Sequence, residues 1–387
     1  MSVKRLLKSE LANFKERRRR IRTADSPDVH ILWGGDARDI NQPKYIADSV
    51  YQAIMNGYTH YAMAGDPDFK NAIAKYYSKF GATIENPLEQ VIINSGGSTG
   101  IFQSFSSLIN PGDEIILFDP TYGAYPNVIQ FLGGKIVKSP LMENSSGLFR
   151  PDIEDLKERI TPTTKAVLVC NPDNPTGCVY TKEELKGIAD LAKDHDFVVV
   201  SDEIYQEFIW CDQPHFPIIS LPDMEDRTIV VMSFSKTYVW TGCRVGCLIS
   251  GPNLASYISK IPLSLGLVPG AFQRAGIVAL EQGGEFVNGL HNRYREATEY
   301  CNERLNGIPK IRCVMPEATF YVWPDISGTG LTDDEFSTKL WDQQQVSVRP
   351  GSLFGEKGEG RERLALVEPL NRLVDAMDRI EIFVKNL

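Results

Sequence analysis

Short apolar runs alternate with amphipathic segments between about residue 46 and about residue 275. The runs have the continuous Val, Ile and Leu content of strands that are buried on both faces. They occupy residues 91–93, 114–118, 166–169, 197–200, 229–232 and 245–249. The segments between them, such as 67–79 and 182–194, predict helices, and Thr181 is a suitable N-cap for the second. This alternation predicts a three-layer α/β fold, in which helices cover both faces of a mostly parallel sheet.

The pattern changes after about residue 280. A charged helical stretch over 285–305 leads into strand-like runs at 320–323 and 346–348, and a final helix is predicted over 369–387. We interpret this part as a smaller α+β domain that the N-terminal residues join. The predicted large domain spans residues 46–280, and the predicted small domain combines residues 1–45 with 281–387.

Composition narrows the possible partners. The 387 residues carry a formal net charge of −9, which argues against a nucleic-acid or anionic-membrane partner. Residues 15–20 are locally basic, and we expect them to form the solvated face of an N-terminal helix. We expect neither a signal peptide nor a membrane span. The seven cysteines are scattered without ligand spacing, so we expect no metal site, no disulfide framework and a cytoplasmic location.

The most informative segment follows the strand-like run at 229–232. Ser233 and Ser235 flank Lys236, and Arg244 follows eight residues later. A lysine amine can form a Schiff base with an aldehyde, while hydroxyls and a guanidinium can bind a phosphate. A neighbouring cation also lowers the pKa of the lysine, which favours the neutral amine. These groups suit a cofactor that carries both an aldehyde and a phosphate.

Three further loops follow predicted strands. Residues 94–100, with Gly97 and Ser98, place glycines at a strand-to-helix turn, where backbone N–H groups can approach an anion; a tight structural turn is the alternative. Asp202 follows another strand, and it either pairs with a protonated pyridine nitrogen or caps a turn. Asn174, in the proline-rich loop 171–177, is either a fixed amide donor or part of a plain turn.

Together these motifs resemble class I and II aminotransferases, which depend on pyridoxal 5'-phosphate and have fold type I. The family's N-P-x-N-P-T-G loop resembles residues 171–177, its D-E-x-Y motif resembles 202–205, and its S-F-S-K region resembles 233–246. Its P-x-Y-x-x-Y segment is similar to residues 120–125, and residues 61–65 also look like a family feature. The resemblance covers about residues 45 to 370 and implies a homodimer with shared active sites.

The resemblance also implies roles for individual residues. Lys236 would form the aldimine with the cofactor and then move a proton, Asp202 would pair with the pyridine nitrogen, and Arg363 would bind the substrate α-carboxylate. The remaining cofactor contacts would come from Tyr205 and Asn174 at the phenolate oxygen, Tyr122 on the ring face, Gly97, Ser98, Ser233, Ser235 and Arg244 at the phosphate, and Tyr61 at the phosphate of the other subunit. A surface position is expected for Arg361, two residues before Arg363, rather than for Arg363.

The sequence departs from the family pattern near the expected substrate site. Gly34 or Gly35 corresponds to a glycine beside the substrate carboxylate, but Asp36, Arg38 and Asp39 are unexpected there. The two acidic residues could favour a cationic substrate side chain, or they could be solvated loop charges. His60 could serve as an additional acid or base, or it could be an ordinary packed histidine.

Three functions are compatible with these observations. The first is an aminotransferase that moves the amino group of an L-amino acid to a 2-oxo acid. The second is an elimination, replacement or cyclisation enzyme of specialised amino-acid metabolism on the same fold, for example a hydroxyarginine-type cyclase. The third is a regulator that senses the cofactor. Only about 45 residues precede the fold, too few for a DNA-binding module with a linker, so the third is disfavoured.

Overall fold

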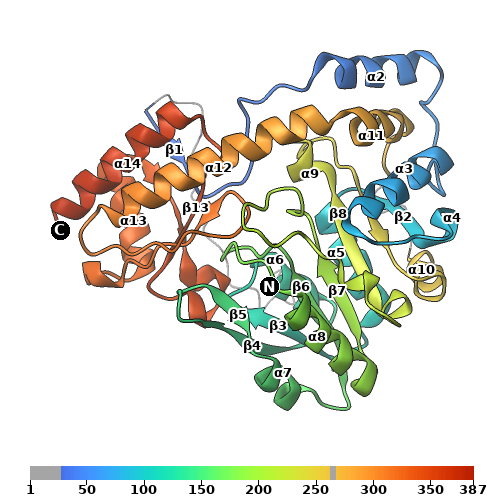
Figure 1. Ribbon diagram of the computed structural model, residues 1–387, viewed down its shortest axis with the longest axis horizontal. Helices are drawn as coiled ribbons and strands as arrows, with labels where there is room; N and C mark the ends of the chain where they lie inside the picture. Colours follow the sequence, from blue (N-terminus) through green and yellow to red (C-terminus); the bar gives the residue numbers. More distant parts are fainter. Residues whose placement is uncertain (1–27, 262–266) are drawn as a thin grey trace, which may run out of the picture.

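The computed structural model describes residues 28–261 and 267–387, and its largest element is an eight-stranded sheet (Figure 1). The predicted N-terminal helix and the first part of the predicted small domain lie outside these residues. The strand order is β2-β9-β8-β7-β6-β3-β4-β5. The strands are β2 (Val91–Asn94), β3 (Glu114–Asp119), β4 (Lys135–Glu143), β5 (Phe149–Pro151), β6 (Thr164–Cys170), β7 (Val198–Asp202), β8 (Thr228–Ser233) and β9 (Gly246–Ile249).

The sheet is mostly parallel, as predicted. The strands from β8 through β7, β6 and β3 to β4 all pair in parallel. The pairs β2–β9, β8–β9 and β4–β5 are antiparallel. All six predicted apolar runs lie in strands, and β2, β8 and β9 are buried along their whole length. The sequence pattern did not indicate β4 and β5.

Helices cover both faces of this sheet. On one face, α5, α6 and α10 pack against Ile115, Leu168 and Val231. On the other face, α3, α7, α8 and α11 pack against alternate residues of the same strands. Thr181 caps α8 through a capping box with Glu184, as its sequence position predicts. The helices are α3 (Pro67–Tyr77), α5 (Gly97–Leu108), α6 (Ala124–Phe131), α7 (Ile153–Arg159), α8 (Lys182–His195), α10 (Pro252–Ile258) and α11 (Gly270–Gln282).

A second hydrophobic core lies at the other end of the molecule (Figure 1). Its strands form two small sheets, β1–β11 and β10–β13–β12. The elements around this core are β1 (His30–Ile31), β10 (Tyr321–Val322), α13 (Asp333–Gln344), β11 (Val346–Ser347), β12 (Arg349–Pro350), β13 (Glu362–Ala365) and α14 (Leu370–Lys385). The long helix α12 (Gly284–Asn306) contributes Val287 to the first core and Cys301 to the second. The division into two domains near residues 45 and 280 stays a prediction.

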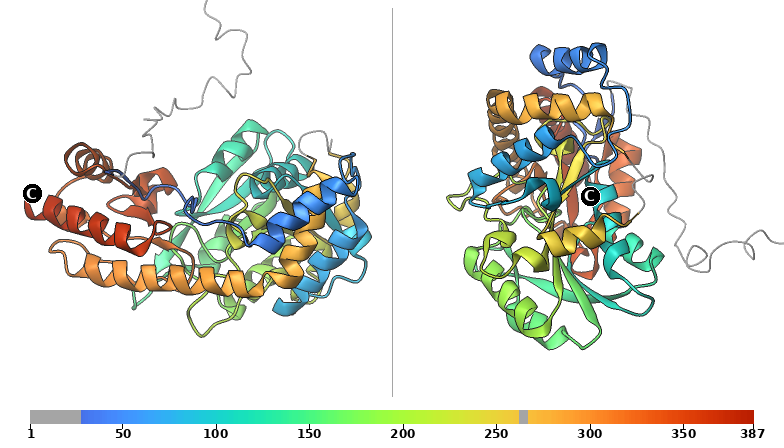
Figure 2. Two further views of the ribbon diagram at one scale, coloured as in Figure 1. Left: turned by 90° about the horizontal axis from the view of Figure 1, so that it is seen from above. Right: turned by 90° about the vertical axis from the view of Figure 1, so that its right-hand side faces the viewer.

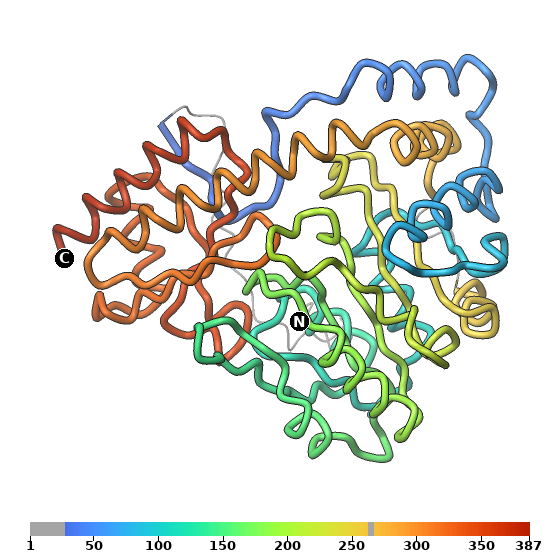
Figure 3. The backbone as a smooth tube through the Cα atoms, in the orientation of Figure 1, coloured from blue at the N-terminus to red at the C-terminus, as the bar shows by residue number. Residues whose placement is uncertain are grey.

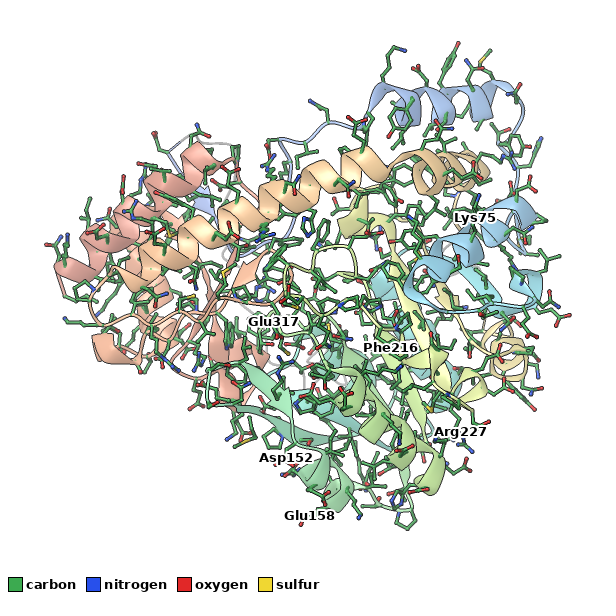
Figure 4. The ribbon with its side chains drawn as sticks, viewed as in Figure 1. Lys75, Asp152, Glu158, Phe216, Arg227 and Glu317 are labelled. Carbon is green, nitrogen blue, oxygen red and sulfur yellow. The ribbon has the colours of Figure 1, made fainter. Side chains whose placement is uncertain are left out.

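Three connections join the two ends. Figure 3 shows the segment 32–43 running from β1 at one end to α2 (Lys44–Met55) at the other. The view from above in Figure 2 shows α12 along the side of the molecule, extending from one region into the other. Glu317, labelled in Figure 4, accepts a hydrogen bond of 2.5 Å from Arg150 of β5. These connections hold the second region, which is the set of elements around the second core, over the carboxyl ends of the central strands.

Candidate active site

The predicted site residues lie at one edge of the sheet. β6, β7 and β8 are parallel neighbours, so the loop 171–177, Asp202 and Ser233 all leave the sheet at its carboxyl edge. The backbone N–H of Asn171 donates a hydrogen bond of 3.0 Å to the carbonyl oxygen of Asp202, which joins two of these strand ends directly. This edge is where open α/β sheets bind their ligands.

Lys236 lies on α9 (Phe234–Thr237), a single helical turn directly after β8. Ser233 caps this turn, because its hydroxyl oxygen accepts a hydrogen bond of 3.2 Å from the backbone N–H of Ser235. The Lys236 Nζ donates a hydrogen bond of 2.6 Å to the carbonyl oxygen of Gly35. Burial lowers the pKa of Lys236 to about 8, which increases the fraction of neutral amine near neutral pH. A neutral lysine amine is a nucleophile for an aldehyde.

Asp202 is a buried carboxylate at the end of β7. The Tyr125 hydroxyl donates a hydrogen bond of 2.7 Å to its Oδ2. Burial raises the pKa of Asp202 to about 6, although the Tyr125 bond opposes this shift. In the part of the chain that the structure describes, no Lys, Arg or His side chain forms an ion pair with it. A cationic nitrogen of a ligand would supply the missing charge.

Asn174, Tyr205 and Arg363 form one hydrogen-bonded group. The Asn174 side-chain amide donates to the Tyr205 hydroxyl at 3.2 Å, and its carbonyl oxygen accepts from Arg363 Nη1 at 3.0 Å. Arg363 Nη2 donates to the Trp33 carbonyl oxygen at 2.6 Å. The Nε of Arg363 is buried without a hydrogen-bond partner, and no carboxylate within residues 28–261 and 267–387 forms an ion pair with this guanidinium. A buried guanidinium in this state is suited to bind the carboxylate of a ligand.

The start of α5 and the Arg244 side chain form a candidate anion site. Gly96 precedes α5 with φ +86°, a left-handed conformation that favours glycine, and a Cβ there would lie 3.0 Å from an Arg244 nitrogen. The Arg244 guanidinium donates to the carbonyl oxygens of Thr241 and Ser95 at 2.9 and 3.1 Å. The site therefore combines a helix N-terminus with a guanidinium, as phosphate sites do.

The donor set as a whole fits pyridoxal 5'-phosphate. It provides an amine with a lowered pKa, a buried carboxylate without a cationic partner, a phenol with an amide, and a group of anion donors beside the Ser233 and Ser235 hydroxyls, which lie 3.0 Å apart. Each of these matches one functional group of that cofactor: the aldehyde, the ring nitrogen, the ring oxygen and the phosphate.

Comparison with known proteins agrees with this chemistry. Residues 39–376 match the sequence profile of the aminotransferase class I and II family. The chain belongs to this family. It is 36% identical to an aspartate aminotransferase of Pyrococcus horikoshii, over 93% of this chain and 92% of that one. It is 31% identical to aromatic-amino-acid aminotransferase 2 of Thermococcus litoralis, over 97% of each chain. The crystal structure of an aromatic aminotransferase from Pyrococcus horikoshii superposes with a TM-score of 0.88 at 32% identity, over 93% of this chain and 96% of that one.

The chain is therefore an enzyme, an aminotransferase, and the predicted family and fold class are confirmed. These relatives favour transamination over the elimination and cyclisation alternatives. The described residues contain no helix that is long and apolar enough to cross a membrane. They also contain no group of three His, Cys, Asp or Glu side chains that could hold a metal ion.

Among the residues predicted for the site of this aminotransferase, Tyr122, Tyr61 and His60 take no part in the hydrogen bonds described above. Tyr122 lies beside the Asp202 partner Tyr125, with ring centroids 5.4 Å apart. Tyr61 is 85% exposed within its own subunit. His60 is also exposed within its own subunit.

The unexpected charges near Gly35 have different surroundings. Asp39 receives hydrogen bonds of 2.8 and 3.0 Å from the two terminal nitrogens of Arg293, so Asp39 is paired within the protein. Asp36 accepts a hydrogen bond of 2.6 Å from the Thr241 hydroxyl and forms a weaker contact with Arg38 at 3.3 Å. Asp36 therefore lies beside the Lys236 segment, whereas Asp39 is tied to α12.

The expectation of a surface position for Arg361 is wrong. This side chain is 8% exposed, and its guanidinium contacts the carboxylate of Glu143 at the end of β4. The guanidinium carbon also lies 5.0 Å from the centroid of the Phe149 ring. The two arginines of this segment thus have separate partners. Arg363 faces the site, and Arg361 links β13 to the β4–β5 hairpin.

Sequence reasoning missed two tyrosines in the site. Tyr125 belongs to the P-x-Y-x-x-Y motif, so the motif itself was the signal for its contact with Asp202. Tyr321 ends the segment 316–321, which is similar to the family's P-x-G-x-F-Y turn with Ala318 at the glycine position. Its hydroxyl lies 3.1 Å from the Tyr205 hydroxyl. The turn motif was a signal for a position near the substrate site, but it did not indicate the contact with Tyr205.

Proposed function

We propose that this aminotransferase binds pyridoxal 5'-phosphate at the carboxyl edge of the sheet and transfers the amino group of an L-amino acid to a 2-oxo acid. When bound, this cofactor supplies an electron sink that stabilises negative charge at the substrate Cα. Lys236 would hold the cofactor covalently and carry the proton to and from that carbon. The observation that best supports this is the 2.6 Å hydrogen bond that fixes a half-buried lysine amine with a pKa of about 8.

The remaining side chains would bind and orient. Asp202 would keep a ring nitrogen protonated, since an adjacent cation offsets the cost of its buried charge. Tyr205 and Asn174 would hold the ring oxygen, and Tyr122 would cover the ring face. The phosphate would be held by Gly97, Ser98, Ser233, Ser235 and Arg244.

Arg363 would receive the substrate α-carboxylate. Its guanidinium is buried and already oriented by Asn174 and Trp33, so it can bind two carboxylate oxygens with little loss of side-chain entropy. Gly35 would border the same carboxylate. This binding orients the Cα–H bond relative to Lys236, and such positioning contributes to the rate of proton transfer. His60 would serve as an additional acid or base.

We further propose a homodimer that completes the site. Large apolar side chains are exposed on α2 and the loop that follows it, including Tyr51 at 59%, Met55 at 65% and Met63 at 56%. Beside them lies a cavity of about 530 Å³ lined by Met63 and Leu88, among others. Several large apolar side chains exposed on one segment are typical of a protein interface. A second copy on this face would cover Tyr61 and bring it toward the neighbouring phosphate site.

We propose a cytoplasmic location, which is supported by the seven free thiols of the chain, because disulfides are rare in reducing compartments.

The covalent role of Lys236 has a direct test. The purified protein, soaked with pyridoxal 5'-phosphate, should absorb visible light, and borohydride should attach the cofactor to a peptide that contains Lys236. Lys236→Ala should lose the absorption, the adduct and transamination. Lys186→Ala is a matched control, since this lysine is paired on the surface with Asp190. A persistent adduct in Lys236→Ala would contradict the assignment.

A further inference from the structure

Tyr321 occupies the centre of the contacts around Arg363. It lies on β10 opposite Ala365 of β13, and its side chain is 3% exposed. Its hydroxyl is 3.1 Å from the Tyr205 hydroxyl, and its ring centroid is 4.3 Å from the Arg363 guanidinium carbon. One side chain thus touches both the phenol assigned to the cofactor and the guanidinium assigned to the substrate.

The hydrogen-bonding capacity of Tyr205 fixes the direction of the first contact. A phenol oxygen has one proton to donate and two lone pairs that accept. The Asn174 amide donates to the Tyr205 oxygen at 3.2 Å. If Tyr205 gives its own proton to the ring oxygen of the cofactor, the remaining contact must be a hydrogen bond that Tyr321 donates. Tyr205 then accepts two hydrogen bonds and donates one.

The second contact restricts the Arg363 guanidinium. Arg363 lies against two aromatic rings, with its guanidinium carbon 4.3 Å from the Tyr321 centroid and 4.9 Å from the Phe354 centroid. The positive charge is attracted to the electron-rich ring faces, and the attraction is larger in a desolvated site. Hydrogen bonds to Asn174 and Trp33 fix the terminal nitrogens in addition. The rings leave the guanidinium little freedom to tilt.

We propose that Tyr321 is a positioning residue that holds the Tyr205 proton toward the cofactor and holds the Arg363 guanidinium ready for the substrate carboxylate. This inference rests on the proposed cofactor and substrate sites, and it adds a residue to them. The titratable or charged groups that face Tyr321 are Tyr205, Arg363, Tyr122 and Arg349.

A double-mutant cycle in the holoenzyme tests the link to Tyr205. Tyr321→Phe removes the hydroxyl and keeps the ring. The pH midpoint of the visible absorption of the bound cofactor should rise by about half a unit to one unit, because the ring oxygen loses part of its hydrogen bonding. kcat should fall about threefold to tenfold, the size of one lost hydrogen bond, with KM unchanged. In a Tyr205→Phe background, Tyr321→Phe should cause no further shift.

Tyr321→Leu tests the link to Arg363. It removes the ring as well, so KM for the amino acid should exceed that of Tyr321→Phe by roughly threefold or more. Thermal melting establishes that both variants fold, and Tyr321→Phe alone decides the role of Tyr321 at Tyr205. An unchanged midpoint in Tyr321→Phe, or shifts that add in the double variant, would overturn the role of Tyr321 at Tyr205. Equal KM values for Tyr321→Leu and Tyr321→Phe would overturn its role at Arg363. A wild-type protein without visible absorption would overturn the proposed cofactor site itself.

Discussion

The Nζ of Lys236 donates a hydrogen bond to the carbonyl oxygen of Gly35, although 201 positions separate the two residues. This contact needs a glycine. A Cβ at position 35 would lie 2.6 Å from the Tyr321 hydroxyl oxygen and 2.8 Å from the Phe320 ring. Gly35 therefore lets the segment 32–43 approach the lysine, Tyr321 and Phe320 at once.

Gly35→Ala should displace this segment. Two aromatic side chains would have to move, and such overpacking typically costs about 1 to 3 kcal/mol of unfolding free energy. We expect a lower melting temperature together with a fall in transamination of at least about tenfold. Gly34→Ala is the matched control, because nothing lies within 4 Å of a Cβ built there. Equal effects of the two substitutions would show that the close approach at Gly35 has no special role.

Asp202→Asn should stabilise the cofactor-free protein in a pH-dependent manner. Burial raises the pKa of Asp202 from 3.8 to about 6, so the folded state binds a proton more tightly than the unfolded state does. The stability that the protonated acid contributes is complete below about pH 4 and is lost as the pH rises through 6. The unfolding free energy of the asparagine variant should therefore exceed that of the wild type by about 2 to 3 kcal/mol at pH 8 and approach it near pH 4.

The measurement is denaturant unfolding of both cofactor-free proteins across this pH range. With the cofactor bound, the wild type should have the larger unfolding free energy, since a ring cation would then stabilise the Asp202 carboxylate. A difference that does not vary with pH would contradict the assigned titration of Asp202.

Arg363→Lys should weaken amino-acid binding while leaving the cofactor in place. The ammonium keeps the charge but loses the planar pair of donors, which costs about 1.5 to 3 kcal/mol. KM for the amino acid should rise roughly tenfold to 100-fold, with an unchanged cofactor spectrum. Arg361→Lys serves as the control. It should lower the melting temperature through the lost Glu143 contact and leave KM unaltered.

Met55→Asp should prevent dimer formation. Met55 is 65% exposed on the apolar surface of α2, and a buried, unpaired carboxylate at an interface costs several kcal/mol. Sedimentation should give a monomer at micromolar concentration. Ile382→Asp changes a residue that is 50% exposed on α14, away from that surface, and should leave the dimer intact. A dimeric Met55→Asp protein would place the interface elsewhere.

Much of this fold was predictable because its central strands are continuous apolar runs that end in polar loops. Lys236, Asp202 and Asn174 each follow such a run, so their meeting at one edge follows from parallel pairing. β4 was missed because charged residues and a proline interrupt its apolar residues, and Lys135 and Glu143 are exposed at its ends.

The remaining contacts depend on residues that are distant in sequence. Asp39 meets Arg293 across 254 positions, and Tyr205 meets Tyr321 across 116. The hydrophobic periodicity of the sequence does not indicate such pairs, because each pair depends on how the second region is placed over the sheet. The same placement buries Arg361, for which a surface position was expected in preference to Arg363.

The exposure of Tyr61 has a consequence for mixtures of inactive variants. If each subunit places this phenol in the active site of its neighbour, a Lys236→Ala chain inactivates its own site. A Tyr61→Ala chain instead inactivates the site of its partner. Hybrids assembled from the two would contain one centre with both defects and one with neither. Co-refolding the two inactive variants should then restore turnover in a fraction of the dimers.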